Sequence, residues 1–325
     1  MTKRLKIVDF LRGFSIFTIA LMHLVQSYDL PSVLDKAATF GGAGVHVFIL
    51  CSGFGLYLSY LYKPLSYGDF LKRRFTKIYL PYIIVIFLSA FWGLYNSGAF
   101  DWQAVLSHVF LYKMFSPAYE SSLGGQMWFV STIIQFYIFW PTMVWIAKKK
   151  QSLIYGLLIS LGWATLVGML GFEGERVWNS FFLQYVWEFV LGMWLANHYY
   201  RYPDRWITPR WGYVCGGIII GMTLTGFMAC NGGILKLYND IPSLLGYLSL
   251  LLFVYKLGMP IVNRFFCYTN RISYEWYLVH ILVFAVVKTS LDGAIPVSME
   301  IILCIVSSYI IAWIYDKALR LCAIK

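Results

Sequence analysis

Two residues suited to acid–base and anion chemistry, Arg12 and His23, lie in the first long apolar stretch of the chain. On an α-helix their eleven-residue separation is three turns plus about 20°, so both would lie on one face, about 16 Å apart along the axis. Asp9 lies about 40° from the same line. An imidazole can exchange protons near neutral pH, and a guanidinium can hold an anion. As alternatives, Arg12 reaches a membrane interface and His23 joins two helices.

A second polar stripe occurs late in the chain, in the segment ISYEWYLVH. Ser273, Tyr277 and His280 stand at i, i+4 and i+7, which places them on one helix face. Ionisable and polar groups at membrane depth usually face a bundle interior or a water-filled cavity. The stripe therefore predicts either a cavity wall or a set of hydrogen bonds to neighbouring helices.

A third candidate is the basic cluster in FLKRRFTKIYLPY, which contains Arg73, Arg74 and Lys77. Most such clusters fix the membrane topology or touch anionic lipid. The spacing of Arg74 and Lys77, at i and i+3, also makes a compact clamp for phosphates, since both donors converge from one helix face.

The other polar residues within or beside apolar segments carry weaker signals. We expect His46 to pack or to line a pore, and His108 and His198, at the ends of helices, to be interfacial. Glu188 and Gln184 are spaced i and i+4 and predict part of a polar cavity wall.

The elements that position these residues follow from composition. Of 325 residues, 60% are hydrophobic and only 13% charged, which excludes a soluble or disordered chain and indicates a polytopic membrane protein. Ten apolar windows are long enough to cross a bilayer. They lie near 7–28, 42–61, 78–95, 127–147, 152–171, 179–198, 212–230, 242–257, 272–289 and 299–316. The stretch 104–115 is too short to span and predicts a re-entrant or interfacial helix.

Loop charge orients the predicted bundle. With both termini in the cytoplasm, twenty of the 26 basic residues fall in inside loops and five outside, as the positive-inside rule requires. Only Arg12 belongs to no loop. We expect one integral-membrane domain over residues 1–325, with no appended soluble domain and no internal repeat. Six scattered cysteines show no metal-binding spacing, and nothing indicates a nucleic-acid partner.

Five motifs in order make the chain resemble the acyltransferase-3 family of bacterial membrane O-acyltransferases, over nearly its whole length. They are DFLRGFSIFTIALMH with its Arg-x10-His pair, GVHVFILCSGF, RRFTKIYLPY, QMWFVSTIIQFYIFWP and ISYEWYLVH. Three departures limit the transfer of roles. Lys77 replaces the second Arg of an Arg-x-x-Arg pair, Thr132–Ile134 replaces an acidic pair present in many relatives, and Gln126 replaces a His of another branch.

The resemblance implies transfer of an acyl group, acetyl by default, from cytoplasmic acyl-CoA to a hydroxyl of a cell-envelope glycan. His23 would be the general base or a transient acyl carrier. Arg12, the other residue predicted to be catalytic, would contact the pyrophosphate or the entrance for the pantetheine arm. Arg74, Lys77 and Arg73 would hold the phosphates of acetyl-CoA. Cavity walls and oxyanion donors would come from five further residues, namely Trp128, Ser273, Tyr277, His280 and Asp9. No metal is expected, and the location implied is the bacterial inner membrane.

Two other functions are compatible with the same residues. A transporter or flippase for an envelope glycan or lipid precursor would also use intramembrane charges and a basic mouth. Repeats and paired broken helices, common in transporters, are not evident in the sequence. A non-catalytic scaffold or sensor is disfavoured by the aligned face of Arg12 and His23.

Overall fold

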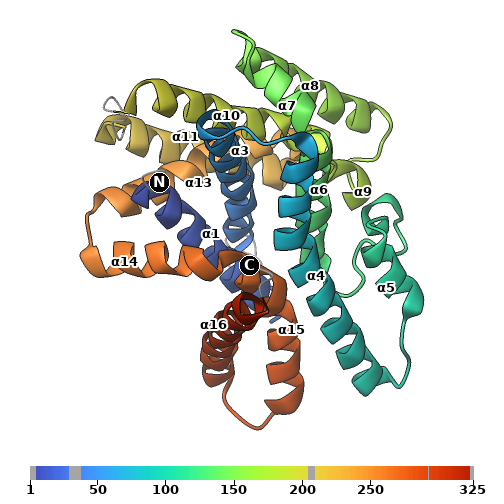
Figure 1. The fold of residues 1–325 in the computed structure, drawn as a ribbon. Helices are drawn as coiled ribbons and strands as arrows, with labels where there is room; N and C mark the ends of the chain where they lie inside the picture. The colour runs from blue at the N-terminus through green and yellow to red at the C-terminus, as the bar shows by residue number, and fades with distance from the viewer. Residues whose placement is uncertain (1–4, 29–37, 204–208, 292, 323–325) are drawn as a thin grey trace.

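The structure of the protein is a computed structural model, which describes residues 5–28, 38–203, 209–291 and 293–322. In this part of the chain every regular element is a helix and no strand occurs. Within these ranges seven helices are long and apolar enough to cross a membrane. The predicted fold class, an all-α polytopic membrane bundle, is confirmed (Figure 1).

The predicted windows fall mainly on the longer helices. These are α1 (Lys6–Val25), α3 (Gly44–Tyr62), α4 (Tyr67–Ser97), α6 (Trp128–Ile138), α7 (Trp140–Ala147), α8 (Ser152–Met169), α10 (Val186–Arg201), α11 (Trp211–Asn231), α13 (Asp240–Lys256), α14 (Pro260–Thr269), α15 (Ser273–Leu291) and α16 (Val297–Leu321). Shorter elements connect them, namely η1 (Phe40–Ala43), α5 (Trp102–Val109), η2 (Lys113–Phe115), η3 (Gly125–Met127), α9 (Arg176–Asn179), η4 (Phe182–Tyr185), α12 (Leu235–Tyr238) and η6 (Asn270–Ile272).

The number of membrane crossings depends on three short or broken segments. The pair α6 and α7 qualifies as a span only if both helices, inclined by 66°, are taken together. Helices α10 and α13 have 16 and 17 residues, just below the 18 residues of the shortest qualifying helix, α8. The count of ten spans and the cytoplasmic placement of both termini therefore stay predictions.

Breaks in the helices place polar residues inside the bundle. Pro141 occupies the first turn of α7, where its missing N–H costs no hydrogen bond, so a new helix starts there in a new direction. The one-turn element η6 separates α14 from α15, so that α15 begins at Ser273. Trp128 follows η3 and opens α6, and Ser273 follows η6 and opens α15; both are predicted cavity residues.

Close helix contacts at glycines hold the centre of the bundle together. Figure 1 shows α1 and α3 in the middle, and α3 packs along α10. A Cβ on Gly53 of α3 would lie 2.1 Å from the carbonyl oxygen of Phe189, and one on Gly192 of α10 would lie 2.1 Å from that of Leu50. Small residues let membrane helices approach this closely, so these two glycines set the α3–α10 distance.

Replacing Gly53 by alanine should destabilise the protein by about 3 kcal/mol, because overpacking against a rigid backbone costs about 1–3 kcal/mol or more. The added methyl group would meet the Phe189 carbonyl, which cannot rotate away. The midpoint of thermal unfolding in detergent measures the effect. Gly55→Ala is the matched control, since no atom lies within 4 Å of a Cβ there. Equal midpoints for the two variants would contradict the packing argument.

Candidate active site

A basic pocket of about 570 Å³ lies at the end of the bundle where α1 begins. Six basic side chains line it against two acidic ones, Glu275 and Asp316. The basic residues are Arg12, Arg74, Lys77, Arg271, Lys317 and Arg320. Such an excess of positive charge favours an anionic ligand.

Arg12 and Arg74 each have a hydrogen-bond donor that lacks an acceptor. The Nε atoms of both are buried and have no hydrogen-bond partner in the described part of the chain. Each guanidinium instead lies 5.7 Å from the centre of an aromatic ring, Phe48 for Arg12 and Phe70 for Arg74. Buried donors without acceptors are costly, so a ligand with several acceptor oxygens would stabilise this arrangement.

The other residues predicted for this region differ in position. Lys77 lines the pocket, as expected for a clamp with Arg74, whereas Arg73 is exposed and outside the lining. Asp9 also lies outside it, and its carboxylate accepts a hydrogen bond of 2.6 Å from Asn270, which is part of the lining.

A second, small cavity, called the passage below, adjoins the basic pocket. Its volume is about 70 Å³, and it shares Arg12, Ser273 and Tyr274 with the pocket. Apolar and aromatic side chains make up most of its wall, including Ile19, Val45, Phe48, Phe129, Ile133, Tyr137 and Tyr277. Arg12 therefore stands at the junction between a charged pocket and an apolar channel.

His23 and His280 form a stacked, hydrogen-bonded pair just beyond this passage. His23 Nδ1 lies 2.9 Å from His280 Nε2, and the two rings are 5.1 Å apart and inclined by 20°. Ile19 precedes His23 by one helical turn, and Tyr277 precedes His280 by about one turn, so the pair follows the passage residues on both helices. The tyrosine hydroxyl donates to the Gln126 carbonyl, which ties α15 to η3.

The hydrogen bonds fix where the protons of this pair reside. His280 Nδ1 lies 2.9 Å from the carbonyl oxygen of Trp276, which can only accept, so Nδ1 carries a proton. In neutral His280, Nε2 is then an acceptor, and His23 must donate from Nδ1. Nε2 of His23 keeps its lone pair and has no hydrogen-bond partner among the described residues. This is the tautomer that a general base requires.

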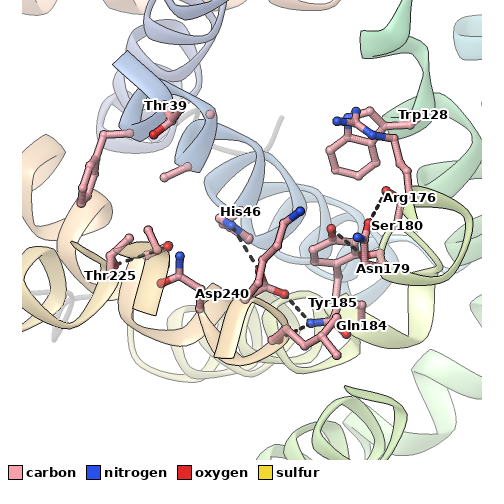
Figure 2. Close-up of a pocket in the computed structure, with 18 of the residues that line it drawn as sticks. Thr39, His46, Trp128, Arg176, Asn179, Ser180, Gln184, Tyr185, Thr225 and Asp240 are labelled. Carbon is pink, nitrogen blue, oxygen red and sulfur yellow. Dashed lines mark hydrogen bonds and ion pairs between the residues drawn. The ribbon is translucent and has the colours of Figure 1, made fainter. Parts of the chain in front are cut away.

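A larger cavity of about 880 Å³ opens at the opposite end (Figure 2). Its lining includes Trp128, one of the predicted cavity residues. It also includes Gly42, which lies against the side chain of Met22, the residue before His23 in the sequence. His46 is held on one wall by Glu188, with His46 Nδ1 and Glu188 Oε1 2.7 Å apart. His46 Nε2 lies 3.7 Å from Asp240 Oδ1.

The same three residues are the candidate metal ligands in the described ranges. Their ligand atoms all lie within 4.8 Å of one another. A hydrogen bond to Glu188 occupies His46 Nδ1, however, which leaves one imidazole nitrogen and Asp240 to face the cavity. Two protein ligands are fewer than the three or four of typical catalytic and structural zinc sites.

The loop that leads into the cavity is anchored by two buried basic side chains. Lys113 Nζ donates to the carbonyls of Ser122 and Gly124 at 3.3 Å. Burial lowers the pKa of Lys113 to about 7, and the positive charge of Arg176 adds to this effect. His108, predicted to lie at the membrane interface, is fully buried within the protein, where it bonds Tyr82 at 2.5 Å and Ser122 at 3.0 Å. Burial lowers its pKa to about 3.

Comparison with known proteins gives the family. The acyltransferase-3 family model, described as an acyltransferase domain, matches residues 5–317. The chain belongs to the acyltransferase-3 family. It is therefore an acyltransferase built as a multi-pass membrane protein. No curated protein and no solved structure matches it.

The structure brings some of the predicted site residues together and places others apart. Arg12, Arg74 and Lys77 meet at one pocket, Ser273 and Tyr277 line the passage, and His23 joins His280 beyond it. The sequence did not predict the group of His46, Glu188 and Asp240, whose members come from three helices far apart in the chain. The sequence did contain a signal for this group, because each of the three is an ionisable residue near the start of an apolar helix.

Proposed function

We propose that this acyltransferase moves an acyl group, acetyl by default, from acyl-CoA to a hydroxyl of a cell-envelope glycan, with His23 as general base. The observation that carries the proposal is the tautomer of His23. Its Nε2 is unprotonated and free in the described part of the chain, just beyond a passage from a basic pocket.

The basic pocket is suited to the nucleotide end of coenzyme A. That end carries a pyrophosphate and a further phosphate, which match the excess of basic side chains and the unpartnered Nε atoms of Arg12 and Arg74. An Arg can bind a phosphate through two parallel hydrogen bonds, whereas Lys77 offers a point charge. Acyl-CoA is cytoplasmic, so the pocket would face the cytoplasm, in agreement with the positive-inside rule.

The passage is suited to the acyl-bearing arm of the donor. Arg12 and His23 are separated by about 16 Å along α1, and the long pantetheine arm of coenzyme A can extend over such a span. The apolar lining excludes water from the thioester, and the small volume of about 70 Å³ favours a short acyl group such as acetyl.

Each step of the reaction can be assigned to a group. His23 Nε2 takes the proton of the acceptor hydroxyl while the hydroxyl oxygen attacks the thioester carbonyl, forming a C–O bond. The tetrahedral oxyanion then collapses, the C–S bond breaks, and the proton on His23 passes to the departing thiolate. The products are an acyl ester and free coenzyme A. Transfer through an acyl-His23 intermediate uses the same lone pair and remains the alternative route.

One experiment tests this function directly. The purified protein in nanodiscs is given radiolabelled acetyl-CoA and the envelope glycan of cells that lack the protein, and ester-linked label in the glycan is counted. Alkali-labile label that depends on His23 supports the proposal. In a parallel assay with the protein in sealed vesicles, movement of the glycan across the membrane without labelling would make the protein a transporter. Thermal stabilisation by acetyl-CoA or by the glycan identifies which ligand the protein binds.

Replacing Arg74 by glutamine should raise the KM for acetyl-CoA about ten- to hundredfold, since a hydrogen bond to a charged group contributes about 1.5–3 kcal/mol. The turnover number should change much less, because the residue is remote from the reacting carbonyl. Initial rates at varied acetyl-CoA concentration give both constants. Arg73→Gln is the matched control, because it removes the neighbouring charge from outside the pocket lining. Similar KM values for both variants would rule out the clamp.

A further inference from the structure

Two residues that line the cavity at the end opposite the basic pocket carry hydrogen-bond acceptors without donors. Gln184 Oε1 and Asn239 Oδ1 are buried and have no partner among the described residues. The orientation of the Gln184 amide is set by its neighbours, since its nitrogen lies 2.6 Å from the Leu237 carbonyl and 2.7 Å from Asp240 Oδ2, both acceptors. Unmet acceptors of this kind favour a ligand that brings several donors.

His46 and Asp240 leave a gap of suitable size for a hydroxyl group. The 3.7 Å between His46 Nε2 and Asp240 Oδ1 is too long for a hydrogen bond. A hydroxyl oxygen placed beside both atoms could donate to the carboxylate and pair with the imidazole. Glu188 fixes His46 from behind through Nδ1, so Nε2 is held toward the cavity. Figure 2 shows His46 and Asp240 facing each other on the cavity wall.

Aromatic surface completes the cavity. Trp128 and Tyr185 both line it, with ring centres 6.0 Å apart and planes inclined by 29°. In Figure 2 Trp128 and Arg176 lie on the side of the cavity away from Thr225. An apolar ring face next to convergent carboxylate, imidazole and amide groups suits a pyranose, which has C–H faces and a rim of hydroxyl groups.

From this arrangement we infer that the cavity binds a sugar residue of the acceptor, with Asp240 and His46 holding its hydroxyl groups and Trp128 packing on its ring face. The inference rests on the proposed function, because it supplies the acceptor for acyl transfer. A volume of about 880 Å³ accommodates the acylated residue and a neighbour in the same chain. Gly42, which lines the cavity, lies against the side chain of Met22, the residue before His23, so the cavity lies at the same end of α1 as His23.

Binding without chemistry tests the inference. Oligosaccharides released from the envelope glycans of cells that lack the protein are mixed with the purified protein in nanodiscs, and saturation-transfer NMR records which sugar protons contact it. We expect saturation of sugar resonances with the unaltered protein. Asp240→Asn, which keeps an acceptor for Gln184, and Trp128→Ala should each weaken the affinity at least tenfold. Glu175→Gln, an exposed carboxylate near the rim and outside the lining, is the matched control.

The outcomes separate this inference from the proposed function. Stabilisation by acetyl-CoA, a ligand of the basic pocket, reports folding of each variant and donor binding. If acetyl-CoA binds but the oligosaccharides give no saturation, or if Asp240→Asn and Trp128→Ala bind them normally, the sugar site is wrong while the donor part of the function stands. Sugar binding without acetyl-CoA binding would support the sugar site and contradict the proposed acyl transfer from acyl-CoA. A stoichiometric divalent metal in the unaltered protein, absent from Asp240→Asn, would assign the residues to a cation instead.

Discussion

Replacing His23 by glutamine should lower the turnover number for acyl transfer by about 10²–10⁴, the usual contribution of a general acid–base group. Glutamine has no lone pair of comparable basicity, and its amide nitrogen can donate to His280 Nε2 as His23 Nδ1 does, so the pair loses its free imidazole nitrogen. The KM for acetyl-CoA should change little, because the basic pocket lies about 16 Å away along α1. Transfer of label from acetyl-CoA to the glycan measures both constants.

A second histidine offers a control for this experiment. His198 is exposed near the end of α10, with its ring stacked on Trp194, and is far in sequence from the passage residues. His198→Gln should retain the activity of the unaltered protein. Full activity of His23→Gln would eliminate His23 as base and as acyl carrier. A labelled acetyl group on the His23 peptide of protein quenched rapidly in denaturant near neutral pH would identify His23 as an acyl carrier.

Replacing His280 by leucine should reduce the turnover number by about ten- to hundredfold, with an unchanged KM for acetyl-CoA. Leucine removes the acceptor for His23 Nδ1, so the imidazole loses both its fixed tautomer and its fixed orientation. Misplacement of a reacting group by about 1 Å can cost about a hundredfold. His280 acts here as a positioning residue, because it reaches the reaction only through His23.

Glutamine at position 280 should restore much of the loss. Its amide nitrogen can donate to the Trp276 carbonyl and its oxygen can accept from His23, which repeats the pattern of the native imidazole. With only five histidines in the chain, ¹⁵N-histidine NMR can follow the tautomer of His23 in each variant. We expect a single Nδ1–H form in the native and glutamine proteins and a mixture in the leucine protein. An unchanged tautomer in His280→Leu would refute this role.

Much of the fold follows from hydrophobic patterning, and the parts that do not have physical reasons. Long apolar runs such as 212–230 coincide with a helix almost residue for residue, since burial in lipid requires internally satisfied backbone. The window 179–198 predicted one helix, but the chain instead forms α9, η4 and then α10 from Val186. At this break the Tyr185 hydroxyl donates to the Asn179 carbonyl, and the Trp187 N–H donates to the Ser160 hydroxyl. No local sequence pattern reveals these contacts.

The site was predictable only where one helix carries it. Arg12 and His23 share a helix, so periodicity alone aligns them. The pairing of His23 with His280 joins residues 257 positions apart and depends on how α1 packs beside α15. His46 and Glu188 are 142 positions apart, and their contact follows from the glycine-lined approach of α3 and α10. These contacts depend on the distances between helices, and a single sequence does not give those distances.

The narrow passage has a consequence for the membrane as well as for catalysis. A protein with polar cavities at both ends is a potential leak for protons and ions, and an apolar constriction blocks such a leak by excluding water. The same side chains, among them Phe48, Phe129 and Ile133, would then limit the length of acyl group that can be delivered. Enlarging the passage to admit longer acyl groups would also admit water and ions. The same side chains would therefore limit both the choice of acyl donor and the leak of ions across the membrane.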